Sequence, residues 1–258
     1  MKTIYLRSSE LAKLTGHNTY EPLEKTIQTI LSFNQIQDVY VPKTNIEKGL
    51  LDVNPDDLVK IKKELLLPPT ATIHQVEKVI QRTILNQSSS SSLLEQESRD
   101  KLASSLQKKK TLQKIQPWIQ QDLQIKRGIQ KEKDNLNSME KKRNWSITHR
   151  NSKLYKKELY RHPQDTYCVV LKGKVDGLCE NRIIETKNRT RCLFKTLRDY
   201  ERVQLESYMY LTGIDQATLT EHYNEDSFEI DYTHDPNFWE QCLLKIIEFI
   251  DEHIAIHL

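Results

Sequence analysis

The strongest constraint on the fold is a change of sequence pattern near residue 144. Before it, most segments between residues 8 and 143 repeat apolar residues at helical spacing and hold few glycines. After it come SKLYKKELY, TYCVVLKGKVDGLC and RIIETKNR, which are short, rich in β-branched and aromatic residues, and bounded by turn residues. We therefore expect a largely helical first half and a second half that contains a sheet.

The remainder of the second half alternates between the two patterns. A helix is expected at TLRDYERVQLESYMYLTG, ending at Gly213, then strands at ATLTEHYN and SFEIDYT, and a last amphipathic helix from Pro236. This order of helix, strands, helix, strands and helix predicts an α/β (α+β) fold in which a mixed sheet is flanked by helices.

Three parts are expected along the chain. Residues 1–34 form an N-terminal helical segment, in which Ser8 or Ser9 is a candidate N-cap. Residues 35–125 form a mainly helical insertion, interrupted by a serine-rich loop at 88–92. Residues 126–258 form the core that carries the strands.

Composition excludes several classes of protein. Hydrophobic residues make up 37% of the 258 residues and charged residues 29%. No apolar run approaches the roughly 20 residues that span a bilayer, and the N-terminus turns polar too soon for a secretory signal. The four cysteines form no CxxC pair, which favours reduced thiols over a zinc site or disulfides. We expect an intracellular protein that is neither secreted nor bound to a membrane.

Charge alone does not identify a partner, because the net charge is only +3. Basic clusters that could neutralise phosphates occur at Lys108–Lys110, Lys126–Arg127, Lys141–Arg143 and Lys156–Lys157. Each cluster taken singly is better explained as the solvated face of a helix.

The stretch GKVDGLCENRIIETKNR carries the chemistry. Glu185 and Lys187 are two residues apart on one expected strand, so they project to the same face, and a hairpin can bring Asp176 beside them. Two carboxylates at adjacent strand ends suit Mg²⁺ or Mn²⁺, with the Thr186 carbonyl as a further ligand. A nearby lysine can orient or deprotonate water, so these groups together suit hydrolysis of a phosphodiester. The alternative is a solvated hairpin of alternating charges, and the motif is short enough to occur by chance.

Several motifs in the same order resemble the PD-(D/E)XK nuclease superfamily, and within it the lambda exonuclease and YqaJ-like viral recombinase family. The matching pieces are RSSELAKLTGHNTY with Ser9, Glu10, Gly16 and Tyr20, RGIQKEKD with Gly128 and Glu132, Asp176-Gly177, Glu185-x-Lys187, and VQLESYMYLTG with Gln204. They cover about 25 residues at the start and residues 126 to 215. The segment from about 35 to 125 has no counterpart in the family pattern.

The resemblance implies a restriction-endonuclease-like fold and a role for each matched residue. Asp176, Glu185, Lys187, Glu132 and Gln204 would be catalytic, and Glu132 would join the metal site directly or through water. Ser9 and Arg7 would bind a DNA phosphate, with Tyr208 and Lys174 as further DNA contacts. The family often has a Trp and an Arg ahead of Ser-Glu, and this sequence lacks that pair before Ser9, so Lys2 or Arg7 would stand in as the phosphate-binding cation.

The expected function is a Mg²⁺-dependent exonuclease that acts on linear duplex DNA in recombination or repair of the viral or phage type. Expected partners are double-stranded DNA ends, a single-strand annealing protein and further copies of the chain, in the cytoplasm or nucleus of an infected cell if the protein is viral. The alternatives are a structure-specific or nicking endonuclease with the same chemistry, or a helical interaction protein with an inactive nuclease remnant. No GxxxxGK[ST] loop occurs, so the sequence contains no Walker-type ATPase motif.

Overall fold

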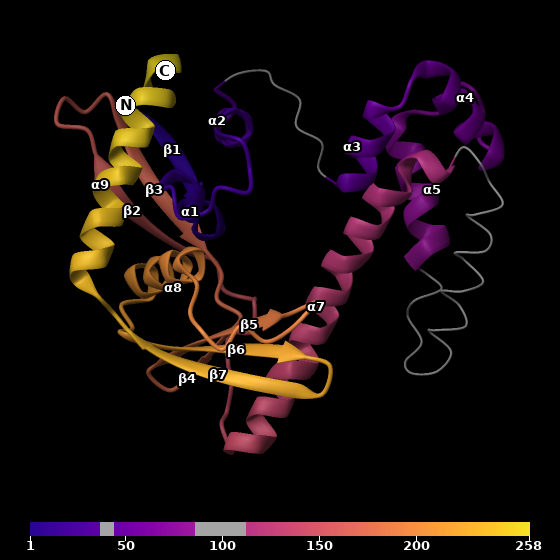
Figure 1. Cartoon of the computed structure of the whole chain (residues 1–258). Coiled ribbons are helices and arrows are strands. Elements are labelled where there is room, and N and C mark those ends of the chain that lie inside the picture. Colours follow the sequence, from indigo (N-terminus) through magenta and orange to yellow (C-terminus); the bar gives the residue numbers. More distant parts are fainter. Residues whose placement is uncertain (37–43, 86–111) are drawn as a thin grey trace. The chain divides into compact units, whose positions relative to one another are not determined.

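The computed structural model describes residues 1–36, 44–85 and 112–258 (Figure 1). The serine-rich loop expected at 88–92 and the Lys108–Lys110 cluster lie outside these residues. The chain divides into two compact units: unit 1 comprises Met1–Val41 with Gly128–Leu258, and unit 2 comprises Pro42–Arg127.

Unit 1 holds two mixed sheets rather than the single sheet that the sequence suggested. The strands of the first are β1 (Lys2–Arg7), β2 (Tyr155–Arg161) and β3 (Tyr167–Gly173), in the order β1-β3-β2. The strands of the second are β4 (Gly177–Cys179), β5 (Arg182–Asn188), β6 (Gln216–Tyr223) and β7 (Asp226–Thr233), in the order β4-β5-β6-β7. Each sheet contains one parallel pair, β1 with β3 and β5 with β6.

The helices of unit 1 pack on these strands in a main core, and α7 (Gln116–Arg143) forms a smaller second cluster with Ile147, Cys179 and Ile184. These helices are α1 (Leu11–Leu14) and α2 (Leu23–Phe33), the part of α7 from Gly128 onward, α8 (Asp199–Thr212) and α9 (Pro236–His253), with short 3-10 turns η1 (Ser8–Glu10) and η3 (Ala255–His257). The main core includes Leu6 of β1, Leu171 of β3, Ile183 of β5, Leu205 of α8 and Ile250 of α9. Burial of such side chains contributes roughly 1.5–3 kcal/mol each, so this core fixes the two sheets against α8.

The ends of the last two helices follow from local chemistry. Gly213 ends α8 with φ of 73°, in the left-handed region that glycine adopts at little cost. Asp235 caps α9 by accepting a hydrogen bond from the Phe238 amide at 3.1 Å, and Pro236 occupies the first turn, where its missing N–H costs nothing.

Unit 2 is helical throughout its described residues. It contains α3 (Asn45–Asp52), α4 (Pro55–Glu64), α5 (Ile73–Leu85), η2 (Leu112–Ile115) and the first residues of α7. Its own core includes Ile46, Leu50, Ile61 and Ile115. In addition, Asp122 accepts hydrogen bonds from the backbone amides of Asn45 and Ile46 at the start of α3, so the termini of these short helices are satisfied locally.

Two expectations for the N-terminus were wrong. Residues 2–7 form a strand, whose inward side chains Ile4 and Leu6 are fully buried. Neither Ser8 nor Ser9 caps a helix: Arg7 occupies the N-cap of η1 without a side-chain cap bond, and the Ser8 hydroxyl donates to the Lys172 carbonyl at 3.4 Å. The serine next to the strand is therefore used to join β1 to β3.

Within the described part of the chain, no helix is both long and apolar enough to cross a membrane. All four cysteines are free thiols, three of them buried.

Candidate active site

Asp176 lies in the bend between β3 and β4, directly before β4 rather than at the end of a strand as expected. The antiparallel β4–β5 pair places Gly177 opposite Ile184, which brings Asp176 alongside Thr186. The Thr186 amide donates to Asp176 Oδ2 at 2.8 Å, and the Thr186 hydroxyl donates to the same oxygen at 3.3 Å. Backbone geometry therefore fixes this carboxylate beside β5.

Gly177 is needed for this arrangement because of its surroundings. A Cβ at this position would stand 2.4 Å from Cγ2 of Ile147. Any larger residue would push Ile147 away or displace the start of β4, and would move Asp176 with it.

Glu185 and Lys187 project together from β5, as the period of a strand predicts. Glu185 is 3% exposed, and Lys187 Nζ donates to Glu185 Oε1 at 2.8 Å. Lys187 also donates to Gln204 Oε1 at 2.9 Å, and Gln204 Nε2 donates to the Tyr208 hydroxyl at 2.8 Å. A continuous chain of hydrogen bonds thus links β5 to α8.

The electrostatics of the carboxylates are unusual. Burial and, next, the charge of Glu132 together raise the pKa of Asp176 to about 6. Burial also raises the pKa of Glu185, and Asp176 adds to this effect while Lys187 opposes it. Oε2 of Glu185 is buried, and none of the residues that the structure describes forms a hydrogen bond with it. Two adjacent buried acids with an unpartnered oxygen are costly unless a cation joins them.

Lys187 remains a cation in this setting. Burial disfavours its charge, but the attraction and hydrogen bond of Glu185 outweigh burial, and the pKa of Lys187 is raised. Because the Lys187 ammonium is protonated and donates to both Glu185 and Gln204, it cannot accept a proton from water until it leaves the ion pair and loses its own proton. Of the two roles expected for Lys187, orienting water and deprotonating it, this arrangement favours the first.

Glu132 reaches the site through a residue that sequence reasoning missed. Asn151, in the segment between α7 and β2, donates from Nδ2 to Glu132 Oε1, and the same nitrogen lies 3.4 Å from Asp176 Oδ1. The pKa of Glu132 is raised by burial, and the hydrogen bond that Glu132 accepts from Asn151 only partly offsets this effect. Asn151 has φ of 46°, a conformation that asparagine tolerates better than most residues. An isolated asparagine in a loop gives no motif by which it could have been found.

A second missed residue, Asn188, ties α7 to the end of β5. The Asn135 amide of α7 donates to Asn188 Oδ1 at 2.9 Å, and Asn188 Nδ2 donates to the Gly128 carbonyl at 3.3 Å. Gly128 and Glu132, which were matched as one motif, are thereby held against the strand that carries Glu185 and Lys187.

The oxygen donors of these residues suit a divalent cation, although they are too few to surround the ion without other ligands. Among the described residues, no three or more His, Cys, Asp or Glu side chains are grouped closely enough to hold a metal on their own. The donor set is nevertheless of the type that Mg²⁺ and Mn²⁺ prefer, because those ions are commonly bound by one or two carboxylates plus water and substrate oxygens. Asp176 and Glu185 would hold the ion, and the unpartnered Glu185 Oε2 supplies a free donor.

The remaining candidates differ in how they are placed. Ser9 and Lys174 are exposed. The Arg7 guanidinium stacks on the Phe33 ring at 4.0 Å and lies 3.6 Å from a Glu10 oxygen. Tyr208 is only 5% exposed and its hydroxyl is bonded to Gln204. In this structure Tyr208 supports Gln204, and its contact with DNA stays a prediction.

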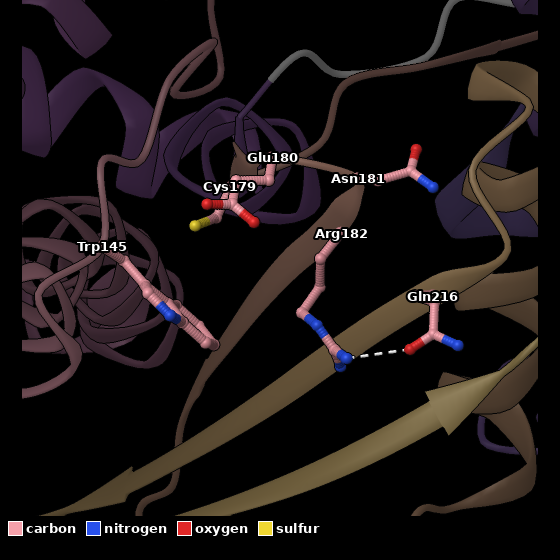
Figure 2. Close-up of a pocket in the computed structure, with 6 residues that line it drawn as sticks. All are labelled: Trp145, Cys179, Glu180, Asn181, Arg182 and Gln216. Carbon is pink, nitrogen blue, oxygen red and sulfur yellow. Dashed lines mark hydrogen bonds between the residues drawn. The ribbon is translucent and has the colours of Figure 1, made fainter.

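A surface pocket lies apart from this site, at the turn of the β4–β5 hairpin (Figure 2). Its lining residues are Trp145, Cys179, Glu180, Asn181, Arg182 and Gln216. The Arg182 guanidinium is already engaged, donating to Gln216 Oε1 at 2.8 Å and to Asp231 Oδ1 at 2.9 Å. Because Cys179 pairs with Arg182 at the turn, the pocket stands at the opposite end of the hairpin from Asp176.

Comparisons with known proteins give partial likenesses only. No family model matches the chain, and no curated protein matches its sequence. Among solved structures, the chain is similar to an alkaline exonuclease, LHK-Exo, from Laribacter hongkongensis, with TM-score 0.41, 15% identity and coverage of 52% of this chain and 70% of that one. It is also similar to LHK-Exo in complex with dAMP, with TM-score 0.39, 13% identity and coverage of 82% and 92%.

A third solved structure, of a protein called SSO0001, gives TM-score 0.38 and 13% identity over 91% of this chain and 88% of that one. All three scores lie below 0.5, so the function of the chain has to be argued from its own residues.

Proposed function

We propose that the chain is a metal-dependent exonuclease that hydrolyses phosphodiester bonds of linear duplex DNA. One observation carries the proposal: two buried carboxylates, Asp176 and Glu185, converge beside the Lys187 ammonium, and one Glu185 oxygen has no partner among the described residues. The order of sequence motifs that resembles the lambda exonuclease and YqaJ-like family supports DNA as the substrate and Mg²⁺ or Mn²⁺ as the cofactor.

The bound metal would act as a Lewis acid and lower the pKa of an attached water. The side chains of the site would hold the ion in place. Asp176 and Glu185 hold negative charge at a fixed place, because the Thr186 amide and the Lys187 ammonium orient them. Glu132 adds a third acid, which Asn151 positions.

Lys187 would act as a cation. Its ammonium is oriented by Gln204, and Gln204 by the buried Tyr208 hydroxyl. A fixed positive charge beside the scissile phosphate stabilises the charge that develops in the transition state and can orient the attacking water. Ser9, Arg7 and Lys174 are the proposed contacts to the DNA phosphates, because all three are exposed.

The test is incubation of the purified protein with end-labelled linear duplex and with a covalently closed circle of the same sequence. With Mg²⁺, an exonuclease releases mononucleotides or short products from the linear DNA and leaves the circle intact, and EDTA stops the reaction. Nicking of the circle would establish the endonuclease alternative. Absence of metal-dependent cleavage of either DNA would contradict the proposal and favour an interaction protein with an inactive site.

A further inference from the structure

Three cations lie side by side across the three-stranded sheet. The register places Arg7 of β1 opposite Lys172 of β3, and Lys172 opposite Lys156 of β2. Directly opposed residues on neighbouring strands point to the same face with their Cβ atoms about 4.5–5.5 Å apart. Like charges in that position destabilise a sheet, so this cation row costs free energy in the protein alone.

The row lies on the face of the sheet that α8 does not cover. Leu171 and Gly173, the neighbours of Lys172 in sequence, face α8: Leu171 is fully buried, and a Cβ on Gly173 would stand 2.8 Å from Leu211 and 3.1 Å from Tyr208. Side chains alternate along a strand, so Lys172 points the other way. Arg7 and Lys156 are exposed and Lys172 is half-buried.

Nearby acids leave most of this charge uncompensated. Arg7 has Glu10, 3.6 Å away. Glu158 shares the face of Lys156, but both of its oxygens accept from Arg161, at 3.0 and 2.6 Å. Neither Lys156 nor Lys172 forms an ion pair within the described residues. The mutual repulsion is consistent with the lowered pKa of Lys172, which has burial as its first cause and Lys156 and Arg7 as the next.

Aromatic rings hold the row in place. The Lys172 ammonium lies 3.1 Å from the centroid of the Tyr5 ring, and the Arg7 guanidinium lies 4.0 Å from that of Phe33. Such contacts keep the cations along the sheet without neutralising them.

The cation row lies close in sequence to residues of the candidate active site. Arg7 is followed by Ser8, whose hydroxyl donates to the Lys172 carbonyl, and β3 reaches Asp176 three residues after it ends at Gly173. The cation row and the candidate active site are therefore joined by a short, continuous piece of chain.

We propose that Arg7, Lys172 and Lys156 form a binding track for the phosphodiester backbone of DNA, outside the catalytic carboxylates. The proposal rests on the proposed function for the identity of the polyanion. The track would bind phosphates, whose charge and spacing are the same for every base sequence.

The experiment measures binding of a short fluorescein-labelled duplex by anisotropy, in EDTA and at a series of salt concentrations. Each phosphate contact contributes about 0.9 to the slope of log K against log salt for B-form DNA. Lys156→Ala should lower that slope by about 0.9 and weaken binding most at low salt. Lys156→Arg should restore both. The matched control is Lys63→Ala, which removes an exposed lysine of α4 in unit 2 and should leave the slope at its wild-type value.

Stability separates a binding role from a structural one. Because the row repels itself, Lys156→Ala should keep or raise the melting temperature while it weakens DNA binding. A wild-type slope and affinity for Lys156→Ala would overturn the track, as would a wild-type protein that binds no DNA.

The two proposals fail separately. Cleavage by the wild type with an unchanged slope in Lys156→Ala removes the track alone. Binding that depends on the track without any metal-dependent cleavage supports the track and removes the nuclease.

Discussion

Lys187 donates hydrogen bonds to Glu185 and Gln204, so its ammonium is held at a fixed point beside two acids. Lys187→Ala should reduce cleavage by about a hundredfold or more, the usual scale for a group that acts in the transition state, and leave DNA affinity in EDTA close to that of the wild type. Single-turnover cleavage and anisotropy measure the two quantities. Near-normal turnover of Lys187→Ala would remove its catalytic role.

Asp176 gives a dependence of stability on pH in the metal-free protein. Its pKa rises from 3.8 to about 6 on folding because of burial. A raised folded-state pKa means that its stabilising contribution is complete below the unfolded value and is lost as the pH rises through about 6. At pH 8 the buried charge should cost on the order of 3 kcal/mol, from 1.36 kcal/mol per pKa unit.

Asp176→Asn removes that charge and keeps an oxygen that can accept from the Thr186 amide. In EDTA at pH 8 the variant should therefore unfold at higher urea concentration than the wild type, and the difference should shrink as the pH falls from about 6 to 4. Urea unfolding at several pH values measures this. Equal midpoints at pH 8 would show that the buried carboxylate carries no such penalty.

The same variant tests the metal. Calorimetric titration with Mn²⁺ should give binding to the wild type and strongly reduced binding to Asp176→Asn, because one of two anionic donors is gone. Equal binding by the two proteins would place the metal elsewhere.

At the scale of elements, the β4–β5 hairpin was the most predictable part of the site. The order of Asp176, a turn, and Glu185 with Lys187 on one strand follows from spacing alone. The approach of α7 was not predictable in the same way, because it depends on Asn151 and Asn188, which contact residues 19 and 60 positions away. No local pattern encodes such contacts.

Asn151 offers a test of that bridge between α7 and β4. Asn151→Ala should weaken Mn²⁺ affinity about 10–100-fold, the range seen when a residue that orients a metal ligand is removed, because Glu132 loses its donor. The melting temperature should change little, since the side chain is exposed. Asn181→Ala, at the turn of the same hairpin, is the control. If both variants bind Mn²⁺ like the wild type, Glu132 does not contribute to the metal site.

At the scale of the whole molecule, the long-range assembly of unit 1 was the part that the sequence could not give. The second half showed its strands and helices through periodicity. β1 was missed because a six-residue strand next to a helical pattern is a weak signal, and its parallel partner lies 165 residues away, at Thr3 and Cys168. The division into two sheets was missed for a related reason: TYCVVLKGKVDGLC reads as one strand, but it supplies β3 to one sheet and β4 to the other.

This assembly brings the N-terminal segment to the region of the candidate active site. Ser8 packs against Gly173 so closely that a Cβ there would lie 2.4 Å from the Ser8 hydroxyl, and the same Cβ would lie 3.1 Å from the ring of Tyr208, which supports Gln204. Ser9 is the next residue and is exposed. Its exposed hydroxyl is accessible to a ligand.

Ser9→Ala combined with Arg7→Ala should therefore slow digestion of ends that carry a 5′-phosphate more than digestion of ends without phosphate, which lose only the contribution of Arg7 to the backbone track. The physical reason is that a hydroxyl and a guanidinium bind a terminal phosphate dianion through charge-assisted hydrogen bonds, worth about 1.5–3 kcal/mol each, and that dianion is absent from an unphosphorylated end. Initial rates on the two substrates give the measurement, and the ratio of the rates cancels any general loss of folded protein. Arg7 also stacks on Phe33, so Ser9→Ala alone is the cleaner variant and should show the same preference at smaller size. Equal slowing on both ends would assign Arg7 to general backbone binding and leave the recognition of 5′-phosphorylated ends without support.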